Sequence, residues 1–152
     1  KSYTNVYEFK DILARAMGGR VAEQILYGDD GITTGAGSDL RNATQIARDM
    51  VIEQGMGKAL RDQVFHEDNG GLMFDKMTRE RPYSDETAKQ IDQEVAALIN
   101  EAKARAMTVL KANRSHLDKL AAALLKDETL EEEAVADILK GTKLPKEAKL
   151  HA

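Results

Sequence analysis

The sequence predicts a mainly α-helical domain, and three observations lead to that prediction. The 152-residue chain is 42% hydrophobic and 32% charged, with no tryptophan and only two prolines, and it is rich in residues that favour helices. Apolar residues recur at helical spacing over several long runs. Residues that typically cap helices stand at several ends of these runs. The length suits one domain with its own hydrophobic core.

The first two predicted helices lie on either side of a glycine-rich loop. The first covers residues 5–27 and ends at Gly28, a typical C-terminal cap. The pair Gly18-Gly19 interrupts this helix and costs it about 1 kcal/mol per glycine relative to alanine, so we expect another backbone to approach there. The loop "GDDGITTGAGS" follows, and the second helix begins at Ser38 or Asp39.

Three more helices are predicted in the second half of the chain. Ser84 caps a long helix whose first turn is acidic, as the helix dipole favours. Another helix starts at Ser115, and a short last one follows Thr129 and Glu132, which have capping-box spacing. The apolar positions of the long helix are Ile91, Val95, Leu98, Ile99, Ala102, Ala106 and Val109, and those of the next are Leu117, Leu120, Ala121, Leu124 and Leu125.

One segment departs from the helical pattern. Two short apolar runs flank Asn69-Gly70, a typical turn pair, so a small β-hairpin is predicted near residues 63–74. The chain has no internal repeat and no low-complexity linker. The predicted organisation is one helical domain over residues 1–141, followed by a flexible tail over residues 142–152.

Composition narrows the functional classes. No stretch approaches the ~18 consecutive apolar residues of a membrane-spanning helix, and the first residues, "KSYTNVYEFK", do not form a signal peptide. The chain opens without methionine, which suggests that it was cut from something longer. Absence of cysteine excludes disulfides and thiolate metal sites and fits a reducing compartment. With a net charge of −4 and no extended basic face, a nucleic-acid partner is not expected.

Most familiar catalytic patterns are missing. His66, His116 and His151 lie far apart on different elements, and "HEDNG" at 66–70 lacks the second histidine of a zinc-peptidase motif. The loop "TGAGSD" has a Gly-x-Gly pair before a helix, but it lacks the remaining residues of a phosphate-binding signature.

Two acids remain as candidates. Asp39 stands near a helix N-terminus, where a carboxylate favours the dipole and can cap the first turn. Glu23 lies on the first helix and could simply face solvent. Considered by spacing alone, both residues fit structural roles.

Longer motifs indicate a family. "GGRVAEQILYG", followed by "TTGAGSDLRNATQIARDMV" and "GMG", resembles the peptidase domain of FtsH-type ATP-dependent zinc metalloproteases (family M41). The stretch from Tyr83 to Val135 resembles the helical C-terminal part of the same domain. The resemblance extends from about Lys10 to Leu139.

The resemblance implies a metal site. In this family zinc is held by two histidines of a His-Glu-x-x-His helix and by a later aspartate, which corresponds to Asp39. Glu23 corresponds to a glutamate that supports a zinc-binding histidine from outside the metal's ligand shell. Gly18 and Gly19 would let their helix pack closely against the metal-binding helix. That helix is absent from the chain, so two ligands and the general-base glutamate are expected upstream, and the chain alone is expected to be inactive.

The resemblance also implies a larger machine. We expect the parent to be a membrane-anchored, hexameric protease that degrades membrane and soluble proteins with zinc-activated water. It would use ATP and Mg²⁺ on an ATPase module outside this chain. Its protease domain would lie in the cytoplasm or the equivalent organelle compartment, and this fragment would be soluble. The alternative is a pseudo-peptidase that serves as an oligomerisation or scaffold domain; an accidental likeness to a generic helical interaction domain is the third reading.

Overall fold

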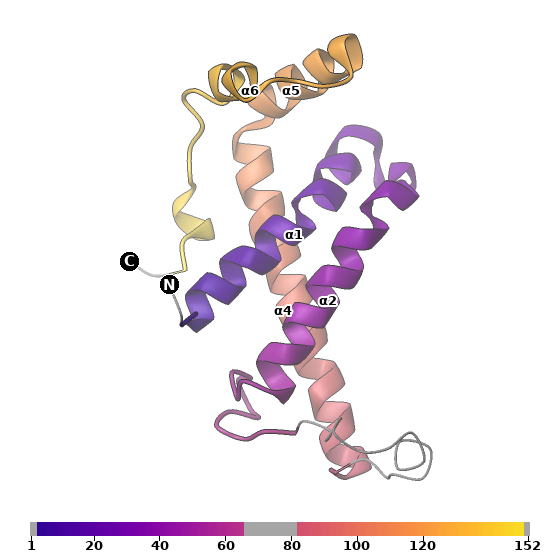
Figure 1. Ribbon diagram of the computed structural model, residues 1–152, viewed down its shortest axis with the longest axis vertical. Coiled ribbons are helices and arrows are strands. Elements are labelled where there is room, and N and C mark those ends of the chain that lie inside the picture. Colours follow the sequence, from indigo (N-terminus) through magenta and orange to yellow (C-terminus); the bar gives the residue numbers. More distant parts are fainter. Residues whose placement is uncertain (1–2, 66–81, 151–152) are drawn as a thin grey trace.

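The computed structural model describes residues 3–65 and 82–150, and it confirms a mainly α-helical fold (Figure 1). Its long helices are α1 (Val6–Tyr27), α2 (Gly37–Ile52), α4 (Asp85–Ala112) and α5 (Arg114–Asp127). The shorter elements are α6 (Glu132–Ile138) and three 3₁₀ turns, η1 (Asp29–Gly31), η2 (Thr34–Ala36) and η3 (Lys146–Ala148). None of the helices within these ranges is both long and apolar enough to cross a membrane.

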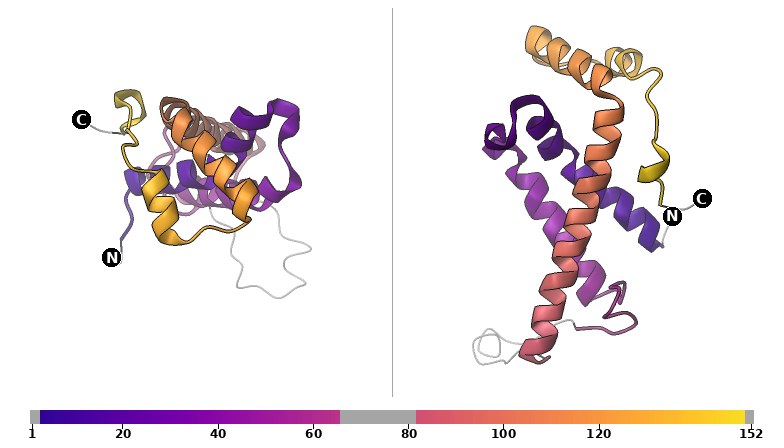
Figure 2. Two further views of the ribbon diagram at one scale, coloured as in Figure 1. Left: turned by 90° about the horizontal axis from the view of Figure 1, so that it is seen from above. Right: turned by 180° about the vertical axis from the view of Figure 1, so that it is seen from behind.

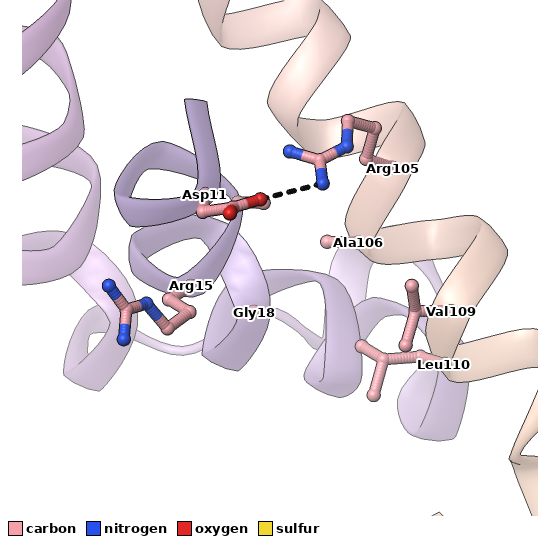
Figure 3. Close-up of a pocket in the computed structure, with 8 residues that line it drawn as sticks. Asp11, Arg15, Gly18, Arg105, Ala106, Val109 and Leu110 are labelled. Atoms are coloured by element: carbon pink, nitrogen blue, oxygen red, sulfur yellow. Dashed lines mark hydrogen bonds and ion pairs between the residues drawn. The ribbon is translucent and has the colours of Figure 1, made fainter. Parts of the chain in front are cut away.

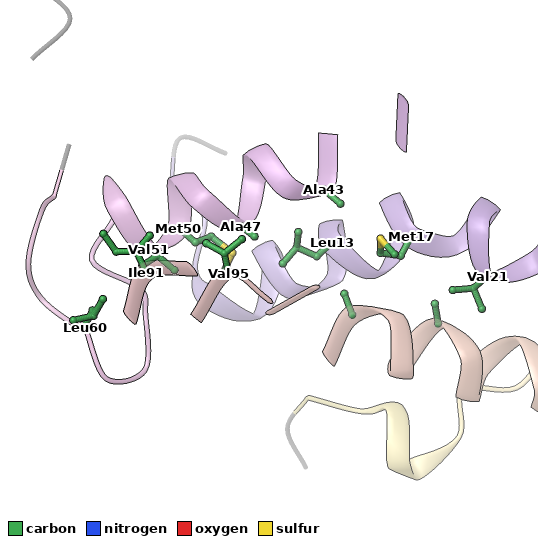
Figure 4. Packing of buried hydrophobic residues seen from close by; sticks show 12 residues of the cluster. Leu13, Met17, Val21, Ala43, Ala47, Met50, Val51, Leu60, Ile91 and Val95 are labelled. Carbon is green, nitrogen blue, oxygen red and sulfur yellow. The ribbon is translucent and has the colours of Figure 1, made fainter. Parts of the chain in front are cut away.

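Helices α1, α2 and α4 form the core. In Figure 1, α4 runs behind α1 and α2, and α5 and α6 lie across one of its ends; the view from behind in Figure 2 shows α4 in front. The apolar stripes of the three core helices meet in the cluster shown in Figure 4. Its most completely buried large side chains are Leu13, Met17, Val21, Met50, Val51 and Ile91.

Local sequence explains where the core helices begin and end. Asn5 caps α1 in a capping box, in which Asn5 Oδ1 accepts from Glu8 N and Glu8 Oε2 accepts from Asn5 N, each at 2.9 Å. Gly28 ends α1 with a positive φ of 84°, a backbone conformation that favours glycine. Ser84 caps α4 and accepts a hydrogen bond from the Thr87 amide. The predicted caps at Gly28 and Ser84 are therefore confirmed.

A loop tied to α4 follows α2. Met56 and Arg61 form an isolated antiparallel bridge, and the Glu94 carboxylate of α4 accepts backbone hydrogen bonds from Lys58, Ala59 and Leu60. Most of the β-hairpin predicted near residues 63–74 lies outside the described residues, and the described part, residues 63–65, is not a strand.

The C-terminal part folds back along the molecule. Asn113, at the junction of α4 and α5, donates to the carbonyls of Val109 and Lys143 and accepts from the Lys143 amide. Arg105 of α4 donates to the Ala148 carbonyl, so the stretch up to η3 lies beside α4 and returns toward the N-terminus (Figure 2). The capping box predicted at Thr129 and Glu132 is wrong: α6 starts at Glu132, and its N-cap residue Glu131 makes no side-chain cap bond.

Candidate functional site

The candidate site is built around Asp39, in the first turn of α2. Its side chain is exposed, and its carboxylate makes no hydrogen bond or ion pair with another residue in the part of the chain that the structure describes. Asp39 is therefore not the cap of its own helix, although its negative charge favours the positive end of the helix dipole. Such a carboxylate is free to bind a partner.

Gly19 of α1 lies next to this carboxylate. A methyl group at position 19 would lie 3.2 Å from Asp39 Oδ2, whereas one at position 18 would meet nothing within 4 Å. We expected another backbone to approach the glycine pair. No backbone of the described residues does so, and this expectation is therefore wrong for that part of the chain. The atom that Gly19 leaves room for belongs to a side chain, and α1 continues through both glycines without a break.

Glu23, one turn after Gly19, binds the loop that leads to Asp39. Glu23 Oε1 accepts from Thr33 Oγ1 at 2.7 Å, and Glu23 Oε2 accepts from Thr33 N at 3.1 Å. The Thr33 hydroxyl, followed by the Thr33 amide, stabilises the ionised carboxylate and lowers the pKa of Glu23 below its ordinary value. Glu23 is thus an ionised loop anchor.

These residues do not make a complete metal site. Within residues 3–65 and 82–150, no group of three His, Cys, Asp or Glu side chains is placed to hold a metal ion. His66 and His151 lie outside the described residues. His116 Nε2 donates to the Lys140 carbonyl, at 2.8 Å, in the contact between α5 and the residues after α6. Asp39 can supply one ligand, whereas a catalytic zinc site has three protein ligands. The described residues therefore do not fit a zinc ion by themselves.

A hollow lies away from Asp39, on another side of α1. A cavity of about 530 Å³ opens between α1 and α4 and is lined by Asp11, Arg15, Gly18, Arg105 and apolar residues of α4 (Figure 3). Arg105 spans its edge, donating to Asp11 Oδ1 at 2.8 Å and to the Lys10 carbonyl. Gly18 faces this hollow, whereas Gly19 faces Asp39, so the two glycines serve different surfaces.

Sequence reasoning missed Thr33 and the true neighbour of Gly19. Thr33 lies ten residues after Glu23, beyond a helix end, and no short motif has that spacing. One pattern was available, because Gly19 and Glu23 are four residues apart and so share a face of α1. That spacing alone indicates a common surface but not what lies on it.

Comparisons with known proteins identify relatives of this chain. The model of Peptidase family M41 matches residues 1–138. Among curated relatives, an ATP-dependent zinc metalloprotease FtsH of Akkermansia muciniphila is 47% identical over 134 residues, which cover 87% of this chain and 16% of that protein. Proteins of the same name from Chloroflexus aggregans and Bacillus subtilis are 42% and 40% identical, and each alignment covers 91% of this chain and 21% or 22% of the relative.

The chain thus spans about a fifth of the length of the curated relatives it matches. The family model covers nearly the whole chain and includes α1, the connection and α2, which carry Glu23, Thr33 and Asp39. This extent of agreement is sufficient to assign the family. The chain belongs to peptidase family M41.

Proposed function

We propose that this chain is the C-terminal portion of the peptidase domain of an ATP-dependent zinc metalloprotease, and that Asp39 is one of the zinc ligands. The observation that carries the proposal is the exposed Asp39 carboxylate, which has no partner among the described residues and lies against Gly19. The three relatives compared above, each an ATP-dependent zinc metalloprotease FtsH by name, support it.

The remaining parts of the site come from outside this chain. Two histidine ligands and a general-base glutamate, on a His-Glu-x-x-His helix, complete the zinc site, and the chain alone is inactive. A metal held by three protein ligands keeps a position for the water that attacks the peptide bond. Glu23 lies one helical turn from Gly19, where it supports a zinc-binding histidine as well as the loop. Each carboxylate oxygen can accept more than one hydrogen bond, so the two roles are compatible.

The surrounding machine follows from the same proposal. An ATPase module with ATP and Mg²⁺ unfolds protein substrates, and a membrane anchor holds the parent, with the protease domain in the cytoplasm or its organelle equivalent. The parent is a homo-oligomer, in the form of a hexameric ring. The exposure of Leu125, at 80%, supports an interface on α5. Mass measurement of the full-length protein tests this part, and a monomer contradicts it.

The test of the ligand assignment uses the full-length protein. We expect Asp39→Asn to lose most of its bound zinc and its cleavage of casein, because the amide is a poor replacement for an anionic ligand. Asp30→Asn, a change at an exposed acid of η1 in the connection before α2, is the matched control and should retain both. Unchanged zinc content and activity in Asp39→Asn would refute the assignment.

A second candidate function is a pseudo-peptidase that serves as an oligomerisation or scaffold domain. The exposed leucines of α5 favour it, because they offer an apolar surface without any catalytic residue. The full-length gene separates the two functions: a His-Glu-x-x-His motif shortly before "KSYTNVYEFK" supports the protease, and its absence supports the scaffold.

A further inference from the structure

A groove runs along the C-terminal half of α4. The hollow shown in Figure 3 adjoins a second one, of about 420 Å³, between α4, α5 and residues 142–144. Val109 and Leu110 line both hollows, and Ala14 of α1 and Leu117 of α5 extend the apolar lining. We call the two hollows together the α4 groove. Each is as large as the pockets in which proteins commonly bind ligands, so the groove can take several side chains of a partner.

The α4 groove has a basic edge. Among the described residues that line it, Arg15, Arg105 and Lys143 are basic and Asp11 is acidic. Asp11 already pairs with Arg105 at 2.8 Å. Arg15 and Lys143 are exposed, and neither side chain pairs with a residue that the structure describes. The groove therefore offers two unpaired positive charges beside an apolar lining.

The end of α5 has the complementary character. Leu124 and Leu125 are exposed there, although side chains of this kind are usually buried. Residues 126–133 follow, with five acids and one lysine. All five acids are exposed, and their carboxylates have no ion-pair partner in the part of the chain that the structure describes. We call residues 124–133 the α5 tip, an apolar pair beside a strongly acidic stretch.

The two surfaces lie apart on one copy of the chain. Leu117, at the start of α5, lines the groove, and the tip begins seven residues later, roughly 10 Å further along the helix. In Figures 1 and 2, α5 leads away from α4 toward one side, whereas the C-terminal segment that borders the groove returns on the other. A contact between the tip and a groove therefore joins different surfaces of two copies. Such head-to-tail contacts close into rings when the rotation between copies allows it.

We propose that the α5 tip of one copy docks in the α4 groove of a second copy. Leu124 and Leu125 cover the apolar lining, and the acids of the tip face Arg15 and Lys143. This inference rests on the proposed function, since it specifies which surfaces form the homo-oligomer. An apolar centre with a charged rim is the usual arrangement of protein interfaces, and the opposite charges orient the two copies as they meet.

Cross-linking tests the pairing directly, because the chain has no cysteine. Lys126→Cys is placed in one full-length copy and Lys143→Cys in a second copy with a different tag, in a background without other reactive cysteines. These positions keep both leucines and Arg15 in place. We expect a short bis-maleimide reagent to join the two tags in the assembled protein. The matched control replaces Lys143→Cys with Asn100→Cys, at an exposed position of α4 outside the groove, and should give no joined product.

A charge swap tests the complementarity with the same cysteine pair. Arg15→Glu should lower the yield of joined product about 10-fold, because acids would then face acids across the contact. Asp127→Arg, added to the copies that carry Arg15→Glu, should restore the yield. A positive charge at the end of α5 also suits the helix dipole, so this change does not harm the fold. Lys89→Glu, an exposed reversal near the other end of α4, is the control and should leave the yield unchanged.

The outcomes separate this inference from the function on which it rests. If the full-length protein is a monomer, the proposed homo-oligomer fails first, while zinc content and casein cleavage still test the peptidase. An oligomer without the joined product of Lys126→Cys and Lys143→Cys refutes the docking and leaves the ring in place. An unchanged yield in Arg15→Glu refutes it as well.

Two further results would identify another occupant of these surfaces. Joined product between two Lys126→Cys copies would show that the tips meet each other. Shielding of Lys143→Cys from maleimide in a dilute, monomeric sample would show that another part of the parent fills the groove. Either result overturns the proposal.

Discussion

Helices α1, α2 and α4 bury their apolar faces against one another, whereas α5 and α6 leave much of theirs exposed. The buried residues of the first group include six large side chains with under 2% exposure, among them Leu13 and Met50. In the second group only Leu117 of α5 is buried, and Leu124 and Leu125 remain 42% and 80% exposed. Two regions with similar apolar patterns therefore differ in how they are stabilised.

The difference shows which part of the molecule holds the candidate site still. Asp39, Glu23 and Gly19 all belong to helices of the well-packed group. The region of α5, α6 and residues 142–150 depends more on polar contacts, chiefly those of Asn113 and Arg105. Precise placement of a ligand needs a rigid support, and exposed leucines suit a surface that meets another molecule.

The largest expected effect comes from breaking the core. Leu13→Ala should lower the free energy of unfolding by about 2–5 kcal/mol, because it removes a fully buried side chain and leaves a cavity. The matched change Leu125→Ala should alter it by no more than about 0.5 kcal/mol, since that side chain already lies in water. Urea unfolding measures the free energy of unfolding of both variants. Equal losses of stability in Leu13→Ala and Leu125→Ala would show that the two regions are packed alike.

An intermediate effect is expected at the junction of the two regions. Asn113→Ala removes three hydrogen bonds of a buried amide, two of them to Lys143, and should lower the free energy of unfolding by about 1–3 kcal/mol. Hydrogen exchange of residues 140–149 should become faster, because this contact holds the segment against α4. Flexibility of residues 142–152 remains a prediction, and this experiment tests it over residues 142–149.

The control for that experiment is Asn100→Ala, a change of the same kind at an exposed position of α4. It should leave both the stability and the exchange of residues 140–149 unchanged. If hydrogen exchange of residues 140–149 is already complete in the wild type at the shortest times, the Asn113 contacts do not restrain this segment.

Helical spacing predicted the fold well because it reports a local property. The apolar stripe of α4 was predicted and is buried at Ile91, Val95, Ala102 and Ala106. The same reasoning gave α5 an equally apolar stripe, yet only Leu117 of that stripe is buried, and Leu124 and Leu125 are exposed. Periodicity identifies an apolar face, but what covers the face depends on distant parts of the chain or on another molecule.

The candidate site was less accessible to local reasoning. Spacing gave Asp39 and Glu23 only structural roles, and the resemblance to a family supplied their proposed ones. The bond between Glu23 and Thr33 joins residues on opposite sides of a helix end, and the contact of Gly19 with Asp39 joins two helices. Both depend on how α1 and α2 pack, which no pattern within one helix specifies.

The smallest expected effect concerns this bond and its dependence on pH. Thr33 lowers the pKa of Glu23 in the folded chain, so the folded state binds the proton of Glu23 less readily than the unfolded state does. The bond therefore stabilises the fold fully above the ordinary glutamate value of 4.5, and this contribution is lost as the pH falls through the lowered pKa. Glu23→Gln cannot ionise, so it lacks the contribution at every pH.

Urea unfolding of the wild type and Glu23→Gln should therefore differ at pH 7 and converge as the pH falls below about 4.5. Glu101→Gln is the control. It neutralises a partly exposed acid that is paired with Lys10, and it shows how much of the change in stability would follow from neutralising any surface carboxylate. The difference should be modest, since Glu23 is partly exposed to water, which weakens charged contacts. A wild type that is less stable than Glu23→Gln at pH 7, and that gains stability relative to this variant as the pH falls, would mean that ionised Glu23 is destabilising. The bond to Thr33 could not then anchor the loop.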